Sequence, residues 1–224
     1  DRRQRQMCIR DRPLWATVRV TGNAFYLNCD VWGTLWPVNT DIGWYDAVDG
    51  QRVITVFNPL WDDYAGYDHA VKLLRLQNVL TKEVETLTPE TEEEFGNDPV
   101  RIYKGDITIS GGYMNIFFMQ NLPSSTDNKH RISLVRPQED DTLYGEDGYV
   151  HLELRYNNNG SQGRLVPGLV SFKLGSYSPE NSELKGLKVL VRPVGGEEKT
   201  YIFSYPLTDK STPDFNLLDL AELK

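Results

Sequence analysis

Hydrophobic and polar residues alternate along much of the first part of the chain, as they do in β-strands with one buried face. From residue 14 to residue 20 every second side chain is apolar, which predicts a first strand. The polar stretch 62–68 is predicted to be a loop. Apolar runs between turn-forming residues predict four more strands, at residues 24–29, 33–37, 51–57 and 69–80. Residues 13–82 are therefore predicted to form a small five-stranded OB-like barrel.

A second series of strand patterns begins after Pro99, with different turns. Gly111-Gly112 predicts a two-residue hairpin, and residues 113–119, apolar on both faces, predict a central strand. A weakly helical leucine pattern occupies residues 214–224. The predicted strands are 101–110, 113–120, 129–136, 149–156, 169–174, 187–192 and 199–205. Short strands with Gly-, Asn- and Pro-rich turns predict an antiparallel β-sandwich over residues 100–224, so the fold class is all-β.

The segment between these two regions is strongly acidic. Residues 83–99 hold seven acidic side chains and no basic one. Thr88-Pro89-Glu90 has the residue types that begin a helix, and Phe95-Gly96 has those that end one. We therefore predict a solvated acidic linker that contains a short helix.

Composition and charge narrow the class of protein. The chain has 224 residues, 39% hydrophobic and 25% charged, as in an ordinary folded protein, and no apolar run long enough to span a membrane. The net charge of -8 argues against nucleic acid as a partner. Residues 1–12 carry +3 of that total, which leaves -11 for the rest. We interpret residues 1–12 as a non-native leader, with the native N-terminus missing.

Chemistry-bearing residues are sparse. Cys29 lies in an apolar run and is predicted to be a buried thiol; Cys8 lies in the leader. The histidines, His69, His130 and His151, are far apart and are interpreted as structural. The aspartates of residues 62–68 lack the spacing of a calcium loop. Because the chain has no nucleophile elbow and no phosphate-binding loop, we predict no catalytic residue, no metal and no cofactor, and hence no enzyme.

All five tryptophans lie in the first 61 residues, so the barrel is the expected place for recognition. Trp36 and Trp61 are predicted to fill the barrel core. Two interpretations stay open for Trp32 and Trp44: core packing, or a stacking platform together with Tyr45 for a sugar or peptide. These last three residues are the candidate binding site.

Several short motifs resemble the NigD-like proteins of Bacteroidales. They are Gly33-Thr34-Leu35-Trp36-Pro37, Gly50-Gln51-Arg52-Val53, Gly66-Tyr67-Asp68-His69, Leu80-Thr81-Lys82, Gly96-Asn97-Asp98-Pro99-Val100, Asn115-Ile116-Phe117-Phe118 and His151-Leu152-Glu153-Leu154-Arg155-Tyr156-Asn157. Their order covers nearly everything after Pro13. The resemblance implies an N-terminal OB-type domain, a C-terminal β-sandwich and a lipoprotein of the cell envelope. It brings no catalytic residues, and Cys8, preceded by Arg-Gln-Met, lacks a lipobox.

Two functional hypotheses result. In the first, the chain is a non-enzymatic cell-envelope lipoprotein, periplasmic or on the outer membrane, that serves bacteriocin immunity or binds a protein partner through the barrel face or the acidic linker. The acidic body would then suit a basic partner. In the second, it is a surface or periplasmic module that binds a glycan or peptide on Trp32, Trp44 and Tyr45. In both, contact with a membrane is expected only through a lipid anchor that this sequence does not contain.

Overall fold

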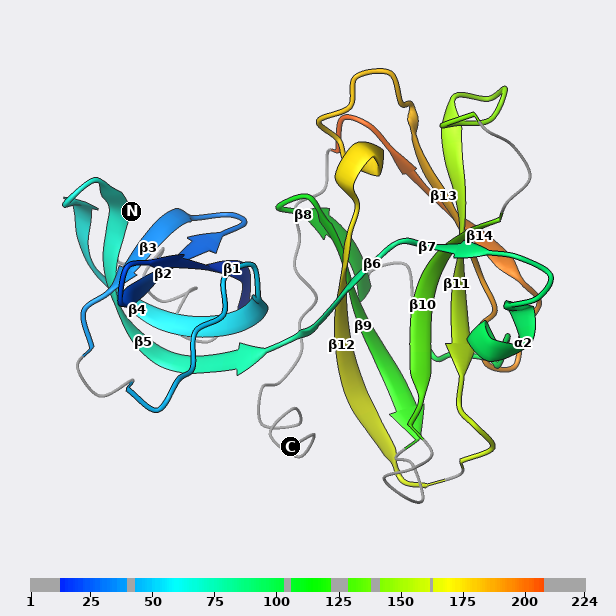
Figure 1. Cartoon of the computed structure of the whole chain (residues 1–224), viewed down its shortest axis with the longest axis horizontal. Helices are drawn as coiled ribbons and strands as arrows, with labels where there is room; N and C mark the ends of the chain where they lie inside the picture. The colour runs from blue at the N-terminus through cyan, green and yellow to red at the C-terminus, as the bar shows by residue number, and fades with distance from the viewer. Residues whose placement is uncertain are drawn as a thin grey trace. The chain divides into compact units, whose positions relative to one another are not determined.

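The computed structural model describes residues 13–39, 43–102, 106–121, 129–137, 142–161 and 163–207. These residues form two compact units, the first ending at Thr81 and the second beginning at Lys82. The first unit is a closed five-stranded barrel and the second contains two sheets, as Figure 1 shows. The predicted all-β class, with a barrel followed by a sandwich, is confirmed.

The five barrel strands lie close to their predicted positions. They follow the order β1-β2-β3-β5-β4 around the barrel. The β3–β5 pair is parallel and the other pairs are antiparallel. Their bounds are β1 (Leu14–Thr21), β2 (Ala24–Cys29), β3 (Gly33–Pro37), β4 (Arg52–Tyr64) and β5 (Tyr67–Asn78).

The barrel core follows from the alternation along these strands. In β1, Leu14, Ala16 and Val18 point into it, as predicted, whereas Val20 is exposed. The remaining buried members of the core are Leu27, Cys29, Leu35, Val53, Phe57, Val71 and Leu73. Cys29 is thus a buried thiol, and burial raises its pKa to about 11.

The polar stretch 62–68, predicted to be a loop, is instead the end of a long hairpin of β4 and β5. Asp62 pairs with His69, and Tyr64 with Tyr67. The chain reverses through Ala65 and Gly66, which both have positive φ, as a two-residue hairpin turn requires. β1 pairs with β4 only as far as Thr55, and β3 pairs with β5 only at residues 69–71. The end of the hairpin, residues 58–69, therefore projects as an arm whose tip is two-stranded.

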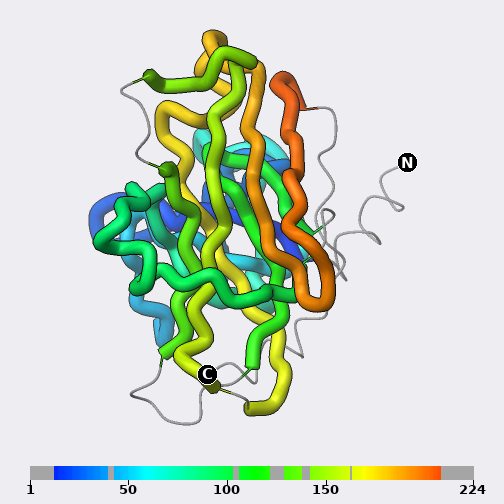
Figure 2. Tube along the Cα trace, turned by 90° about the vertical axis from the view of Figure 1, so that its right-hand side faces the viewer, coloured from blue at the N-terminus to red at the C-terminus, as the bar shows by residue number. Residues whose placement is uncertain are grey.

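The second unit is built from two sheets, one of five strands and one of four. The five-stranded sheet has the order β14-β13-β11-β10-β7, and Figure 2 shows its strands side by side. The other has the order β6-β12-β9-β8. The bounds are β6 (Leu80–Glu83), β7 (Glu85–Leu87), β8 (Ile107–Ser110), β9 (Tyr113–Asn121), β10 (Arg131–Pro137), β11 (Tyr149–Asn157), β12 (Leu165–Lys173), β13 (Gly186–Val191) and β14 (Lys199–Ser204); a 3₁₀ turn, η2, covers Gly175–Tyr177.

Two strand pairs depart from the antiparallel prediction. β7 runs parallel to β10, and β11 runs parallel to β13. The second arrangement arises because the chain leaves β11, forms β12 in the other sheet, and returns to β13 in the same direction. The predicted Gly111-Gly112 hairpin is confirmed, and β9 lies between β8 and β12.

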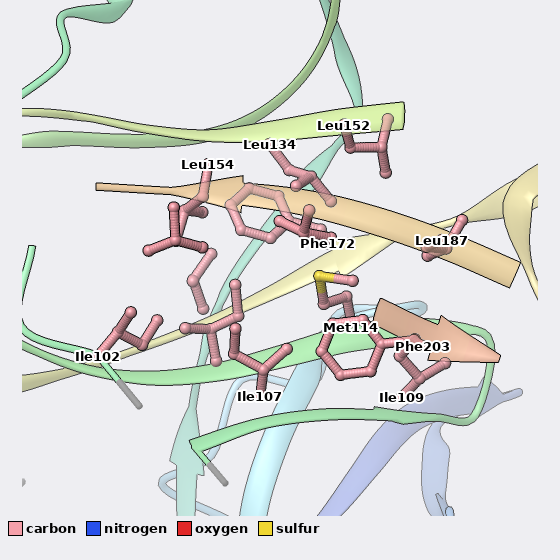
Figure 3. Close-up of a cluster of buried hydrophobic side chains, with 14 of the residues drawn as sticks. Ile102, Ile107, Ile109, Met114, Leu134, Leu152, Leu154, Phe172, Leu187 and Phe203 are labelled. Atoms are coloured by element: carbon pink, nitrogen blue, oxygen red, sulfur yellow. The ribbon is translucent and has the colours of Figure 1, made fainter. Parts of the chain in front are cut away.

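Side chains of both sheets meet in an aliphatic core (Figure 3). Met114 and Phe172 come from the four-stranded sheet, and Leu134, Leu152 and Leu187 come from the five-stranded sheet. All five are at most 2% exposed. The sandwich is therefore held together by apolar burial between its two layers.

Residues 83–99 belong to the second unit, so they are not a linker between the units, although most of their acidic side chains are exposed, as predicted. β7 pairs with β10, and Phe95 is buried at the end of α2 (Glu92–Phe95). The helix is shorter than predicted: it ends before Gly96 as expected but begins at Glu92, because Thr88–Glu90 precede it as a turn.

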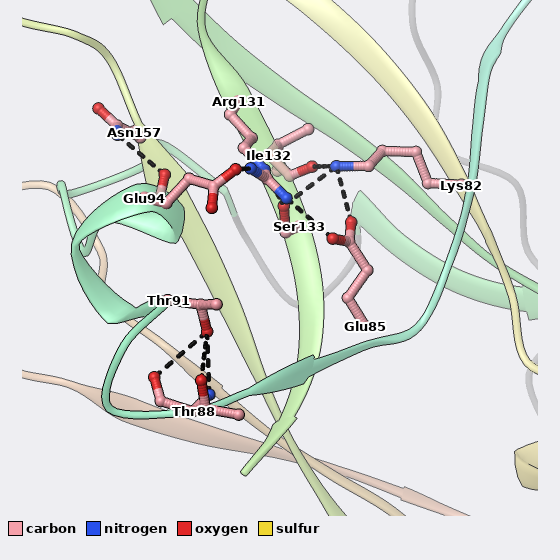
Figure 4. Close-up of polar contacts among 9 residues, drawn as sticks. All are labelled: Lys82, Glu85, Thr88, Thr91, Glu94, Arg131, Ile132, Ser133 and Asn157. Atoms are coloured by element: carbon pink, nitrogen blue, oxygen red, sulfur yellow. Dashed lines mark hydrogen bonds and ion pairs between the residues drawn. The ribbon is translucent and has the colours of Figure 1, made fainter. Parts of the chain in front are cut away.

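Polar contacts join this acidic segment to β10 (Figure 4). The Lys82 ammonium donates to the carbonyl of Ile132 at 2.7 Å and lies 3.3 Å from Glu85. The Arg131 guanidinium donates to Glu85 at 2.8 Å and also to Glu94, and it stacks 4.4 Å from the centre of the Phe95 ring. Basic side chains of the second unit thus neutralise acids that the sequence pattern assigned to solvent.

The proposed leader, residues 1–12, and the leucine pattern of residues 214–224 lie outside the described residues. Within the described residues, no helix has the length and apolar character needed to cross a membrane.

Candidate functional site

The five tryptophans occupy very different environments in the barrel unit. Trp15 is 1% exposed on β1, Trp32 and Trp36 are half-buried, and Trp44 and Trp61 are 68% and 58% exposed. The prediction that Trp61 fills the core is wrong, because it lies on the arm, opposite Ala70, with its side chain exposed. Trp36 also lies outside the core cluster, in register with Ala70.

Trp32 is partly buried and packs against the barrel core. Its ring centre lies 5.7 Å from that of Phe57, edge to face, and 4.8 Å from that of His69. His69 Nδ1 is 2.9 Å from a carboxylate oxygen of Asp62. This packing supports the structural interpretation of Trp32, and it explains His69 as a residue that connects the core to the arm.

Trp44 and Tyr45 form a separate pair in the loop after β3. Their rings meet edge to face with centres 6.1 Å apart, and Tyr45 also packs against Phe25 at 5.4 Å. The Tyr45 hydroxyl donates to Asn78 at 2.7 Å. Burial, followed by the nearby charge of Asp46, raises the pKa of Tyr45 to about 12. Tyr45 therefore anchors the loop, and Trp44 presents its ring to solvent.

A third group of rings was not anticipated from the sequence. Tyr67 lies 4.9 Å from Trp36 and 5.1 Å from Tyr26, ring centre to ring centre. These residues come from β3, β2 and β5, so the cluster crosses three strands. The signal available in the sequence was the position of Tyr26 and Trp36, each next to a core leucine and hence on the opposite face of its strand.

Hydrogen bonds between Thr34 of β3 and Asp68 of β5 fix the register of these strands, and we call this pair the staple. Asp68 accepts hydrogen bonds from the backbone N–H and the hydroxyl of Thr34, at 2.8 and 3.1 Å. The Asp68 N–H donates in turn to the Thr34 hydroxyl at 2.9 Å. Chiefly because of the Thr34 N–H, the pKa of the Asp68 carboxyl is lowered. Gly33 leaves space for this carboxylate, since a Cβ there would lie 2.2 Å from Asp68 Oδ2.

The arm carries the fourth group of rings. Trp61 and Tyr64 stack with an interplanar angle of 26° and centres 6.1 Å apart. Leu60, Trp61 and Tyr64 are all at least 40% exposed. Asp62 and Asp63 lie between Trp61 and Tyr64 in sequence, Asp68 follows, and residues 58–69 contain no lysine or arginine. This combination of exposed rings and negative charge occupies the part of the chain that was predicted to be a solvated loop.

A pocket of about 580 Å³ lies on the barrel between the β1–β2 turn and the loop that carries Tyr45. Trp36, Phe25 and Tyr45 supply its aromatic walls, and Asn23 and Asp46 add polar groups. Its size is typical of a small-molecule site. Of the predicted residues, Tyr45 lines it, whereas Trp32 and Trp44 are not among its lining residues.

Acid–base groups are engaged in structural contacts. His130 contacts the Tyr156 hydroxyl at 2.5 Å, and His151 contacts Asp147. The Lys188 ammonium donates to Asp147 at 2.7 Å and, together with the Tyr149 N–H and His151, lowers the pKa of that carboxyl. In the part of the chain that the structure describes, no three His, Cys, Asp or Glu residues gather as a metal site would require.

Comparison with family models matches both units. Residues 15–79 match the NigD-like N-terminal OB domain, and residues 83–205 match the NigD-like C-terminal β-sandwich domain. The chain belongs to the NigD-like family. The boundary between the two matches agrees with the division between the units at Thr81 and Lys82, and it places the acidic segment in the sandwich domain.

Solved structures share the two-domain fold of this NigD-like chain. A protein of unknown function from Bacteroides vulgatus is 47% identical, with a TM-score of 0.84 over 95% of this chain and 99% of its own. A NigD-like immunity protein from Bacteroides caccae is 18% identical, with a TM-score of 0.62 over 87% and 93%. A proposed lipoprotein from Bacteroides fragilis is 12% identical, with a TM-score of 0.58 over 89% and 99%. No curated protein matched the chain.

Proposed function

We propose that this NigD-like protein is a non-enzymatic protein of the bacterial cell envelope that binds a protein partner, in the manner of an immunity protein. The observation that carries the proposal is the outward placement of the barrel's aromatic residues. Trp44 and Trp61 are more than half exposed, and a third ring cluster crosses the outer face at Trp36. Exposed aromatic rings are over-represented at the centres of protein interfaces.

The charge of the chain supports a basic partner. After residue 12 the net charge is -11, and complementary charge accelerates association and helps to reject wrong partners. The NigD-like immunity protein and the proposed lipoprotein that share this fold support an envelope location and an immunity role. A lipid anchor on the N-terminal side of the barrel would bring the barrel to the membrane surface.

A protection assay tests this proposal. The protein, equipped with an envelope-targeting lipoprotein signal, is produced in a sensitive strain that is then exposed to toxins encoded beside its gene. We expect survival, and no survival when the signal is omitted and the protein stays inside the cell. Failure to protect against every co-encoded toxin, at normal levels of envelope-localised protein, would remove the immunity role.

A second candidate function is binding of a glycan or peptide at Trp44 and Tyr45, with Trp32 nearby in sequence. The 68% exposure of Trp44 and the neighbouring pocket favour it. Titration with a glycan panel should then change tryptophan emission, and Trp44→Ala should abolish retention on the immobilised ligand. Unchanged emission across the panel, with equal retention of both proteins, would exclude this function.

A further inference from the structure

The arm formed by the end of β4 and the start of β5 presents an unusual surface for the tip of a hairpin. Leu60, Trp61 and Tyr64 are 43%, 58% and 40% exposed. Trp61 and Tyr64 stack with ring centres 6.1 Å apart, and this exposed pair is the aromatic plate of the arm. Single exposed apolar residues are ordinary, but neighbouring ones that form a patch often mark an interaction site.

The arm holds this plate in a fixed position. β4 and β5 remain paired as far as Tyr64 and Tyr67, and the extra residue Leu60 forms a bulge between Pro59 and Trp61. A bulge of this kind turns the side chains that follow it and strengthens the local twist. The Asp62–His69 contact joins the two strands of the arm, and the Asp68–Thr34 staple ties the arm to β3.

The segment that carries the plate is acidic. Asp62, Asp63 and Asp68 lie within residues 58–69, which have no lysine or arginine. Asp68 is held by Thr34 and Asp62 contacts His69, whereas Asp63 lies at the exposed tip. A stacked aromatic pair beside carboxylates has the chemistry that binds guanidinium and ammonium groups, through cation–π contact with the ring face and charge pairing at its edge.

We propose that this arm is the docking element for a basic, arginine- or lysine-containing segment of a protein partner. The proposal rests on the proposed function and specifies the partner chemistry. An arginine of the partner lies flat on the Trp61–Tyr64 plate, and its neighbours pair with Asp63. The acidic character of the whole chain attracts such a segment, and the plate selects it from other cations.

The first experiment measures the affinity of purified protein for a fluorescein-labelled peptide of alternating arginine and glycine, by fluorescence anisotropy. We expect binding that weakens as salt is added, and no binding of the matching glutamate–glycine peptide. Trp61→Ala should weaken binding about tenfold or more. Equal affinity of Trp61→Ala and the unaltered protein for the arginine peptide would overturn the proposal.

Matched variants distinguish binding at the arm from non-specific binding to any exposed acid or ring of the protein. Asp63→Asn removes the charge but suits the positive φ of 51°, because asparagine tolerates that conformation; we expect about two- to fivefold weaker binding. Glu197→Gln and Tyr144→Ala alter an exposed acid and a ring of the sandwich that is as exposed as Tyr64, and both should leave the affinity unchanged. Equal weakening by Glu197→Gln and Asp63→Asn would show non-specific attraction and overturn the assignment to the arm.

The protection assay distinguishes this proposal from the function on which it rests. Loss of protection in Trp61→Ala, at unchanged protein level, supports the docking element. Full protection by Trp61→Ala, together with undiminished peptide binding, removes the docking element and leaves the immunity role intact. Absence of protection by the unaltered protein, with peptide binding that depends on Trp61, removes immunity and leaves the docking element.

Discussion

The two domains use aromatic and aliphatic residues in opposite ways. In the described chain, the sandwich gathers 21 buried hydrophobic residues into one core, whereas the barrel core has ten. All the tryptophans are nevertheless in the barrel unit, and four of the five are only partly buried or exposed. The barrel therefore uses its large rings mainly on its outside, while the sandwich fills its interior with aliphatic side chains and phenylalanine.

The polar contacts of the two domains also have different roles. In the barrel they join strands around the closed sheet: Asp68 to Thr34, and the buried Arg52–Asp30 pair at 2.7 Å. In the sandwich they attach an acidic segment to the edge of a sheet through Lys82 and Arg131. The comparison indicates that a small barrel depends on polar links to fix its register, whereas the sandwich depends on apolar burial.

The largest expected effect comes from removing a core ring of the sandwich. Phe172 is 0% exposed between the two sheets, so Phe172→Ala should lower the free energy of unfolding by about 3–5 kcal/mol. Urea denaturation followed by far-UV circular dichroism measures this loss. Because tryptophan emission reports only on the barrel unit, it gives a separate transition for the other domain. A loss below 1 kcal/mol would contradict the assignment of sandwich stability to this core.

The second prediction concerns the barrel staple. Gly33→Ala places a Cβ 2.2 Å from Asp68 Oδ2 at a φ of +78°, so both steric conflict and backbone strain oppose it. We expect a loss of about 1–3 kcal/mol in the tryptophan-monitored transition. Gly50→Ala is the control, because Gly50 is also in the barrel unit and its φ is +83°, but no atom lies within 4 Å of the added Cβ. Equal losses in the two variants would mean that strain alone matters and that the staple contributes little.

The sequence predicted the regular parts of both domains well. Alternation from Leu14 onward and the Gly111-Gly112 turn specify strands and hairpins locally, so these elements lie where expected. Parallel pairing of β11 with β13 has no local signature, because it depends on a connection through the other sheet. The acidic composition around Phe95 predicts a linker, but the segment is structured. Its neutralising partner, Arg131, is distant in sequence, so the local pattern does not show this pairing.

The candidate site was less predictable than the fold. Trp61 was assigned to the core because large rings usually fill small barrels, but the paired β4–β5 arm carries it past the core. Trp32 and Trp44, grouped by sequence, lie in different surroundings, one against Phe57 and the other in solvent. Sequence spacing cannot show which rings of different strands meet, as Trp36, Tyr26 and Tyr67 do.

Acid should weaken the two domains through different carboxylates. The pKa of Asp68 in the barrel and of Asp147 in the sandwich are both lowered, mainly by hydrogen bonds from Thr34 and Lys188. A lowered folded-state pKa gives stabilisation that is complete above the ordinary value of 3.8 and disappears as the pH falls through the folded value. Asp68→Asn should reduce barrel stability at neutral pH and differ less from the unaltered protein in acid. Asp147→Asn should do the same for the sandwich. If either substitution lowered the stability of both domains equally, the assignment of each carboxylate to its own domain would be wrong.

The smallest change in the free energy of unfolding is expected for an exposed ring of the barrel domain. Trp61 is 58% exposed on the arm, so Trp61→Ala should change the free energy of unfolding by less than about 0.5 kcal/mol, despite the size of the side chain. Trp36→Ala should cost more, because its ring packs on Tyr67 at 4.9 Å and such pairs contribute about 0.5–1.5 kcal/mol. Urea titrations of both variants, followed by circular dichroism, test the ordering. A larger loss for Trp61→Ala would place this ring among the residues that hold the barrel together and would remove the reason to regard it as a surface for a partner.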